Sequence, residues 1–194
     1  MSETEPRPDD LTYGPDALAT PANMVTVLRL LVSPLLFISI ADDGASWFNV
    51  VLWTALASTD GIDGWIARRH GTTRSGAFLD PLADKVLILG ALFALVSIGR
   101  FSWIPVALIA VREVAISLER VHFGRRGLAV PARQTAKIKT FLQSIAIGLA
   151  LLPPLSETPW VADVVLWASV VMALVSAAQY AMDGARATSA RGSH

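Results

Sequence analysis

The amino-acid sequence predicts an all-α membrane protein with six transmembrane helices. Hydrophobic residues make up 53% of the 194 residues and charged residues only 16%, whereas about a quarter of the residues in a typical soluble domain are charged. A transmembrane helix needs about 20 mostly apolar residues, and runs of roughly that length occur in six places. The predicted helices cover residues 22–41, 46–67, 75–99, 103–121, 135–152 and 160–182.

The charges in the segments between these helices support the same fold class. Lys and Arg gather at 68–74, at 120–139 and after residue 182, whereas the intervening loops hold Asp42, Asp43, Glu157 and a single basic residue, Arg100. Because basic loops stay on the cytoplasmic side, we expect a multi-pass protein of the cell (inner) membrane with both termini in the cytoplasm. A soluble helical protein with a large apolar core is the alternative, and six consecutive long apolar runs argue against it.

The two ends of the chain are expected to lie outside a single membrane domain. Residues 1–20 are rich in acidic residues and proline, which is typical of a disordered tail beside the membrane. Residues 186–194 are expected to form a C-terminal tail, and residues 21–185 one domain of six helices without internal repeats. The 16 basic and 16 acidic residues balance, so no overall charge favours nucleic acid as a partner.

Four aspartates stand at helical spacing near the cytoplasmic ends of the second and third predicted helices. Asp60 and Asp63 are three residues apart and Asp80 and Asp84 four, so each pair shares one helix face. Helices joined by a short loop are expected to be antiparallel neighbours, which would bring the four carboxylates together. Such a cluster repels itself unless a cation is present, and its oxygen atoms suit Mg²⁺, Mn²⁺ or Ca²⁺. The alternative is a solvated ion-pair network with nearby cations: Arg68, Arg69, Arg74 and Lys85.

The residues around these aspartates resemble the signature of the CDP-alcohol phosphotransferases. That signature reads D-x-x-D-G-x-x-A-R, then seven or eight residues, then G-x-x-x-D-x-x-x-D, and residues 60–68 and 76–84 match every fixed position. The resemblance implies a six-helix membrane enzyme, usually a homodimer, that transfers a phosphate-linked group from a CDP-bound lipid to an alcohol. It also implies two divalent ions, Mg²⁺ or Mn²⁺, in a site open to the cytoplasm.

The same resemblance implies roles for single residues. Asp60, Asp63 and Asp80 would be metal ligands. Asp84 would be the base that takes the proton of the acceptor hydroxyl, and it would also contact a metal; a carboxylate within hydrogen-bond reach of that hydroxyl is suited to this task. The pocket for the CDP donor would be formed by Gly64, Ala67, Arg68 and Gly76.

Three further segments resemble the phosphatidylglycerolphosphate synthase branch of that family. They are residues 23–29 (N-x-x-T-x-x-R), the pair Arg112-Glu113, and residues 136–143, where the branch has G-K-x-K-T-x-x-Q and this chain begins with Ala136. The resemblance implies CDP-diacylglycerol as donor, sn-glycerol 3-phosphate as acceptor, and phosphatidylglycerol phosphate and CMP as products. The acceptor's phosphate would be held by Arg112, Lys137 and Lys139.

Other interpretations of these residues stay open. For Arg112, which lies in an apolar run, the alternative is an internal pair with Glu113 or with an aspartate of the site. Lys137 and Lys139 would equally anchor a helix end at the membrane surface. The acceptor would then be another alcohol: inositol phosphate, serine, or phosphatidylglycerol in cardiolipin synthesis. An ion-coupled transporter also carries acids within the membrane, but transporters usually have repeated halves and broken helices, which this sequence lacks.

Overall fold

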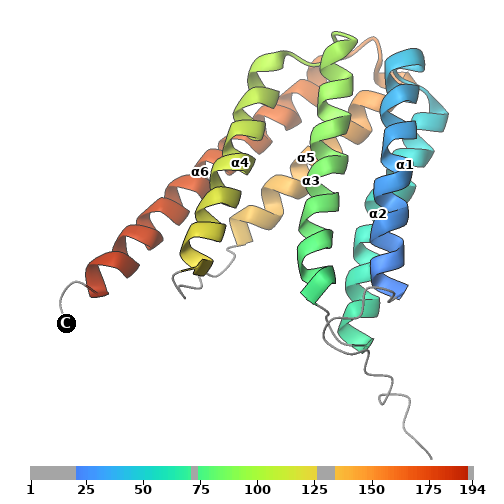
Figure 1. Ribbon diagram of the computed structural model, residues 1–194. Coiled ribbons are helices and arrows are strands. Elements are labelled where there is room, and N and C mark those ends of the chain that lie inside the picture. The colour runs from blue at the N-terminus through green and yellow to red at the C-terminus, as the bar shows by residue number, and fades with distance from the viewer. Residues whose placement is uncertain (1–20, 71–73, 126–133, 192–194) are drawn as a thin grey trace, which may run out of the picture.

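The computed structural model describes the backbone of residues 21–70, 74–125 and 134–191, and the side chains of residues 23–59, 79–119, 137–179 and Met182. Within these ranges the chain is all-helical, which confirms the predicted α class (Figure 1). Its elements are α1 (Pro21–Asp43), α2 (Trp47–His70), α3 (Arg74–Ser97), α4 (Trp103–Arg125), α5 (Gln134–Leu151), the short 3₁₀ helix η2 (Pro153–Leu155) and α6 (Trp160–Arg191).

The first five helices begin and end within four residues of their predicted bounds, and α6 does not. α6 continues to Arg191, nine residues past the predicted end at 182 and through most of the predicted tail 186–194. Extending an existing helix costs far less than starting one, and residues 183–191 include three alanines and two arginines, which favour helix. The predicted end of α6 was therefore wrong.

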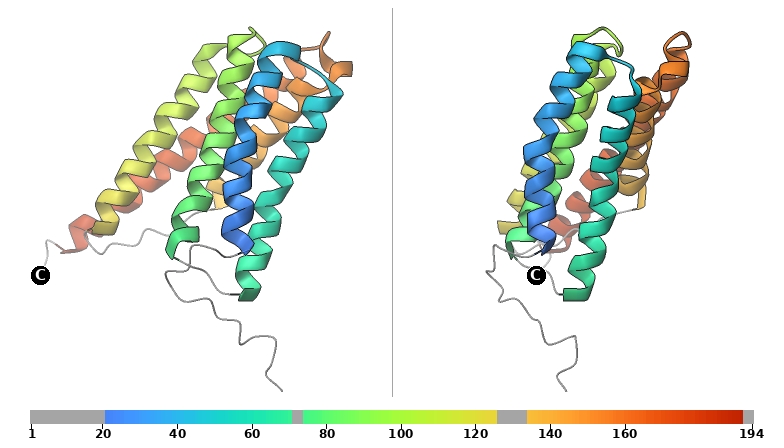
Figure 2. Two further views of the ribbon diagram at one scale, coloured as in Figure 1. Left: turned by 45° about the vertical axis from the view of Figure 1, so that its right-hand side comes forward. Right: turned by 90° about the vertical axis from the view of Figure 1, so that its right-hand side faces the viewer.

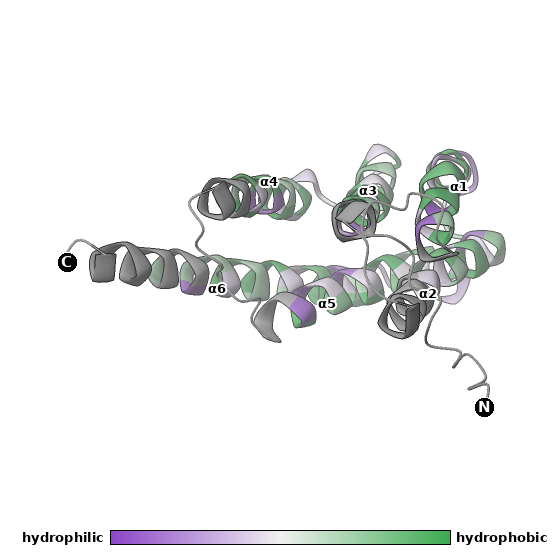
Figure 3. Cartoon of the chain, turned by 60° about the horizontal axis from the view of Figure 1, so that its bottom comes forward, coloured by the Kyte–Doolittle hydropathy of each residue, from purple (hydrophilic) through white to green (hydrophobic). Residues whose placement is uncertain are grey.

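The six helices form two layers of three. α1, α3 and α4 make one layer, and α2, α5 and α6 make the other, as Figures 2 and 3 show from the side and from below. Contacts run within the layers, between α1 and α3 and between α5 and α6, and across them, between α1 and α2, α4 and α6, and α3 and α5. The expected direct packing of α2 on α3 is not a main contact of the described residues, because α1 packs against both.

Two of the six described helices have the length and apolar composition to cross a membrane. They span Asn23–Asp43 in α1 and Trp160–Gln179 in α6. The other helices contain charged groups within their apolar runs, such as Lys85 in α3 and Arg112 in α4. Large apolar side chains nonetheless point outward on several of them, among them Val51, Phe93, Val111, Leu118 and Phe141. Many exposed large apolar side chains are typical of proteins that contact lipid or a partner.

Short turns join the helices at the end of the bundle opposite the predicted site. Gly44 ends α1 with a φ of 60°, a left-handed conformation that glycine adopts without steric cost. Its N–H donates to the carbonyl of Ile40 at 2.9 Å, and its own carbonyl accepts from the Asn49 amide at 2.8 Å. The hydroxyl of Ser46 caps α2 by accepting the N–H of Asn49 at 3.2 Å. Gly44 therefore ends α1 after Asp43, two residues beyond the predicted end at residue 41.

The single arginine at this far end is bound into the turn between α3 and α4. Arg100 lies 3.8 Å from the carboxylate of Asp163 at the start of α6 and donates to the carbonyl of Pro159 at 3.3 Å. Partial burial lowers the pKa of Arg100 from its usual value, and the nearby Asp163 carboxylate opposes this shift. The pair links the α3–α4 turn to α6.

Close packing of α1 on α3 depends on one glycine. A methyl group built on Gly90 of α3 would lie 2.2 Å from the ring of Phe37 in α1, far inside the distance that carbon atoms tolerate. A methyl group on Gly148 of α5 would meet Trp53 at an ordinary 3.6 Å. Only the first glycine is therefore required for its small size.

We expect Gly90→Ala to destabilise the protein by about 1 kcal/mol, because the overpacking strain exceeds the helix propensity that alanine gains. Gly148→Ala is the matched control, and it should leave the melting temperature in detergent unchanged or slightly raised. Thermal unfolding of both variants measures the difference. Equal melting temperatures for the two variants would contradict the close approach of Phe37 to α3.

Candidate active site

Helix α3 carries Asp80 and Asp84 one turn apart, as their spacing predicts. Both carboxylates are half-buried. The hydroxyl of Thr26, which is fully buried in α1, donates a hydrogen bond of 2.7 Å to Oδ1 of Asp80. The contact between α1 and α3 therefore fixes the orientation of this carboxylate.

The other two aspartates of the predicted metal site are on α2. The backbone is helical at Asp60 and Asp63, so both positions lie on one helix face, but their side chains are outside the described residues. The same holds for the four residues expected at the CDP donor: Gly64, Ala67, Arg68 and Gly76. Among the side chains that are described, no group of three or more His, Cys, Asp or Glu residues gathers. The cluster of four carboxylates stays a prediction.

The two aspartates that are described fit a hard divalent cation. Asp80 and Asp84 supply only oxygen atoms, which Mg²⁺ and Mn²⁺ prefer as ligands. The chain has no cysteine, so a thiolate site is excluded. Two carboxylates one helical turn apart also repel each other, and a bound cation would offset that repulsion.

A cavity of about 800 Å³ lies between α2, α3, α4 and α5, with Arg29 of α1 at its wall. We call it the main cavity. In Figure 3, α3 and α4 lie in one layer and α2 and α5 in the other, so the cavity separates the two layers. Among the residues that the structure describes, its charged lining residues are five cations and two carboxylates: Arg29, Lys85, Arg112, Lys137 and Lys139, with Asp84 and Glu113. This excess of positive charge suits an anionic ligand.

The cavity brings together most of the residues that the sequence predicts for the acceptor. Asp84 lies on one wall, and Arg112, Lys137 and Lys139 lie on the others. Lys137 is exposed and Lys139 is buried, although the two are on the same helix only two residues apart. The apolar part of the wall includes Trp53, Ala57, Ile88, Ile116, Phe141 and Ile145.

Glu113 joins two of these cations in one buried cluster. Its Oε1 accepts a hydrogen bond of 2.8 Å from Nη1 of Arg112 and a second from Nζ of Lys139. Arg112 also donates to Ser176 at 2.9 Å and to the carbonyl of Ala173 at 3.3 Å, both in α6. The internal pairing of Arg112 with Glu113, which the sequence left open, is thus present, and the arginine still lines the cavity.

Two further cavity residues, Arg29 and Lys85, were not assigned to the substrate site from the sequence. Arg29 is 1% exposed, and its Nε donates to the hydroxyl of Thr59 at 3.0 Å. Lys85 donates to the hydroxyl of Ser117, which links α3 to α4. Arg29 could have been selected as a candidate site residue from the sequence, because an arginine within an apolar run is costly and is therefore usually functional.

Comparison with known proteins identifies the family of this chain. The family model for CDP-alcohol phosphatidyltransferase matches residues 19–175. A relative from Mycobacterium tuberculosis named probable phosphatidylglycerophosphate synthase is 37% identical over 169 residues, which cover 84% of this chain and 80% of the relative.

Relatives from other bacteria carry the name of the corresponding reaction. A Bacillus subtilis protein named CDP-diacylglycerol–glycerol-3-phosphate 3-phosphatidyltransferase is 32% identical, over 81% of this chain and 91% of its own length. One of the same name from Cereibacter sphaeroides is 36% identical, over 67% of this chain and 62% of its own length. With the family match covering residues 19–175, the chain belongs to the CDP-alcohol phosphatidyltransferase family and is an enzyme of phospholipid synthesis.

Proposed function

We propose that this enzyme transfers the phosphatidyl group of CDP-diacylglycerol to sn-glycerol 3-phosphate, with phosphatidylglycerol phosphate and CMP as products. The observation that carries the proposal is the main cavity, in which Asp84 shares one space with five cationic side chains. A carboxylate suited to proton transfer and a cationic wall suited to a phosphate are the two features that a phosphorylated alcohol requires. The names of the relatives point to the same pair of substrates.

In the proposed reaction, the carboxylate of Asp84 takes the proton of the acceptor's primary hydroxyl. The hydroxyl oxygen then forms a bond to the phosphorus that carries diacylglycerol. The bond between that phosphorus and the bridging oxygen of the diphosphate breaks, and CMP leaves with the bridging oxygen. Arg112, Lys137 and Lys139 orient the acceptor by its phosphate, which makes the attack effectively intramolecular.

The donor side of the site depends on the aspartates of α2 and α3. Asp60, Asp63, Asp80 and Asp84 would hold two divalent cations, Mg²⁺ or Mn²⁺. When bound, these ions neutralise the charge of the diphosphate and of the departing CMP. Gly64, Ala67, Arg68 and Gly76 would form the pocket for the CDP group. The hydrogen bond from Thr26 holds Asp80 in place for this task.

The proposal includes the position of the enzyme in the membrane. We place all six helices across the bilayer, with the carboxylates and both termini on the cytoplasmic side, because the basic loops fall there. Six charged residues of α3, α4 and α5 line the cavity, which is where a membrane protein tolerates them: Asp84, Lys85, Arg112, Glu113, Lys137 and Lys139. We further propose a homodimer, with residues 1–20 outside the membrane domain.

The experiment that tests the proposal offers purified protein CDP-diacylglycerol with Mg²⁺ or Mn²⁺ and a panel of acceptors. CMP release should occur with sn-glycerol 3-phosphate and not with inositol phosphate, serine or phosphatidylglycerol. CMP release with inositol phosphate alone would show that inositol phosphate is the acceptor instead. The absence of CMP with every acceptor would refute the reaction.

We expect Lys137→Ala to raise the KM for sn-glycerol 3-phosphate about tenfold, the value of one lost charge-assisted hydrogen bond, with kcat little changed. Lys137 is exposed at the cavity wall, so its removal should not affect folding. Lys137→Arg keeps the charge and should retain most of the affinity. Steady-state kinetics with varied acceptor measure both, and an unchanged KM in Lys137→Ala would remove this residue from the acceptor site.

A further inference from the structure

A small recess adjoins the main cavity between α3, α4 and α5. Its volume is about 30 Å³, the space that one water-sized oxygen group occupies. Eight residues line it: Asp84, Lys85, Ile88, Leu89, Glu113, Lys139, Thr140 and Gln143. All of these except Leu89 and Gln143 also line the main cavity, so a ligand in the main cavity would lie directly beside the recess.

Gln143 contributes an unpaired donor to this recess. The residue is 2% exposed, and its Nε2 has no hydrogen-bond acceptor among the residues that the structure describes. A buried N–H without an acceptor is costly and rare in folded proteins. The neighbouring Glu113, whose Oε1 accepts from Arg112 and Lys139, is not an acceptor for this N–H. The recess is therefore suited to an oxygen atom that accepts one hydrogen bond from Gln143.

We propose that this oxygen is the acceptor's second hydroxyl, the one that does not react. This inference rests on the proposed function. Asp84, which would take the proton of the reacting hydroxyl, and Lys139, which would hold the phosphate, both line the recess. A three-carbon polyol phosphate carries its middle hydroxyl between its reacting hydroxyl and its phosphate. An acceptor bound between Asp84 and Lys139 therefore presents that hydroxyl to Gln143.

Gln143 is then a specificity-determining residue for the acceptor. A buried donor that is satisfied only by a substrate hydroxyl discriminates strongly against an analogue that lacks it, because the donor is left unpaired. The recess has a volume of about 30 Å³, which is room for about one oxygen group. The enzyme should therefore require a hydroxyl on the middle carbon, in the configuration that points toward α5.

The test compares sn-glycerol 3-phosphate with 3-hydroxypropyl phosphate, which lacks only the middle hydroxyl. For the unaltered enzyme, kcat/KM measured by CMP release should be about tenfold to a hundredfold lower with the analogue. Gln143→Met keeps the length of the side chain and removes the amide. It should lose about that factor with sn-glycerol 3-phosphate and little with the analogue, so that the preference falls close to one. Gln179→Met, the same change in α6 away from both cavities, should retain the preference.

Each result decides between distinct possibilities. Equal use of the two acceptors by the unaltered enzyme overturns the assignment without any substitution, so the test stands even if Gln143→Met does not fold. An equal loss for both acceptors in Gln143→Met also overturns it, and assigns the recess to a resident water or to packing. If the unaltered enzyme releases no CMP with sn-glycerol 3-phosphate, the proposed function fails instead.

Discussion

Asp80→Asn should lower kcat on the order of a thousandfold, because a bound divalent ion contributes several kcal/mol to the stability of the transition state. The substitution is close to isosteric, and the Asn carbonyl oxygen can still accept the 2.7 Å hydrogen bond that Thr26 donates to Asp80. The fold should therefore persist while the negative charge is lost. CMP release at saturating substrates measures kcat, and thermal unfolding checks the fold.

Asp42→Asn is the matched control for this prediction. Asp42 is exposed near the end of α1, at the far end of the bundle from Asp80, so its substitution should leave kcat unchanged. Chelation of divalent ions should abolish turnover in the unaltered enzyme, and added Mg²⁺ or Mn²⁺ should restore it. A near-normal rate for Asp80→Asn would show that this carboxylate is not part of the reaction.

Glu113→Gln should destabilise the protein by about 3 kcal/mol, because it leaves two buried cations without their shared counter-ion. Arg112 and Lys139 both donate to the same oxygen of Glu113, and the amide that replaces it carries no charge. For a chain of this length the apparent melting temperature should fall by roughly 6–12 °C. Thermal unfolding in detergent measures the change.

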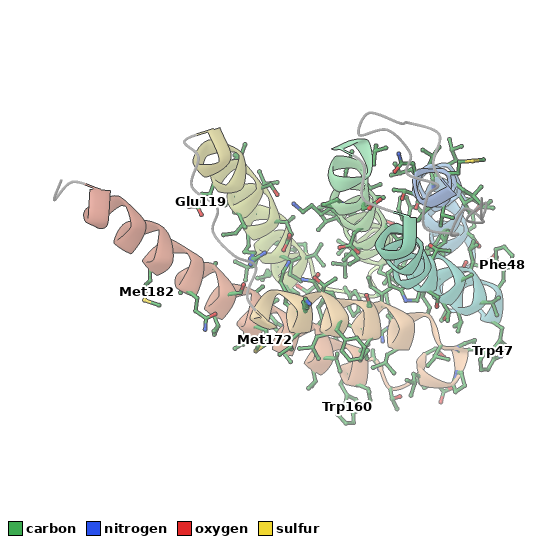
Figure 4. All side chains as sticks on the ribbon, turned by 90° about the horizontal axis from the view of Figure 1, so that it is seen from below. Trp47, Phe48, Glu119, Trp160, Met172 and Met182 are labelled. Atoms are coloured by element: carbon green, nitrogen blue, oxygen red, sulfur yellow. The ribbon has the colours of Figure 1, made fainter. Side chains whose placement is uncertain are left out.

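Glu119→Gln provides the control on the same helix, since Glu119 is exposed on α4 (Figure 4) and takes part in no contact with Arg112 or Lys139. Its melting temperature should match that of the unaltered protein. Added sn-glycerol 3-phosphate should stabilise Glu113→Gln more than the unaltered enzyme, because the phosphate supplies the missing negative charge. If Glu113→Gln is as stable as Glu119→Gln, the buried cluster does not support the fold.

The helices were predictable because each rests on a local pattern. Apolar runs of membrane-spanning length and stops such as Asp42-Asp43-Gly44 need no knowledge of tertiary contacts. The end of α6 was not predictable from polarity, because a helix that is already formed extends through polar residues at little cost. The two-layer arrangement was also missed. α1 packs against both α2 and α3. Its close packing on α3 depends on the small size of Gly90, and no local sequence pattern indicates that contact.

The candidate site, like the fold, was predictable from the sequence only in part. The spacing of Asp80 and Asp84 and the cationic residues of α4 and α5 were identified from the sequence, and the structure brings Asp84, Arg112, Lys137 and Lys139 to one cavity. The sequence did not identify the hydrogen bond from Thr26 to Asp80, because it joins residues 54 positions apart. The sequence also did not show that Nε2 of Gln143 lacks a hydrogen-bond acceptor among the described residues, because only packing decides whether a polar group has a partner.

Titration by electron paramagnetic resonance in the presence of CDP-diacylglycerol gives the number of Mn²⁺ ions bound per chain. The proposed metal site predicts about two ions for the unaltered enzyme, held by the carboxylates of α2 and α3, and a loss of bound Mn²⁺ in Asp80→Asn in parallel with its loss of turnover. Full Mn²⁺ occupancy in Asp80→Asn together with a near-normal rate would contradict it.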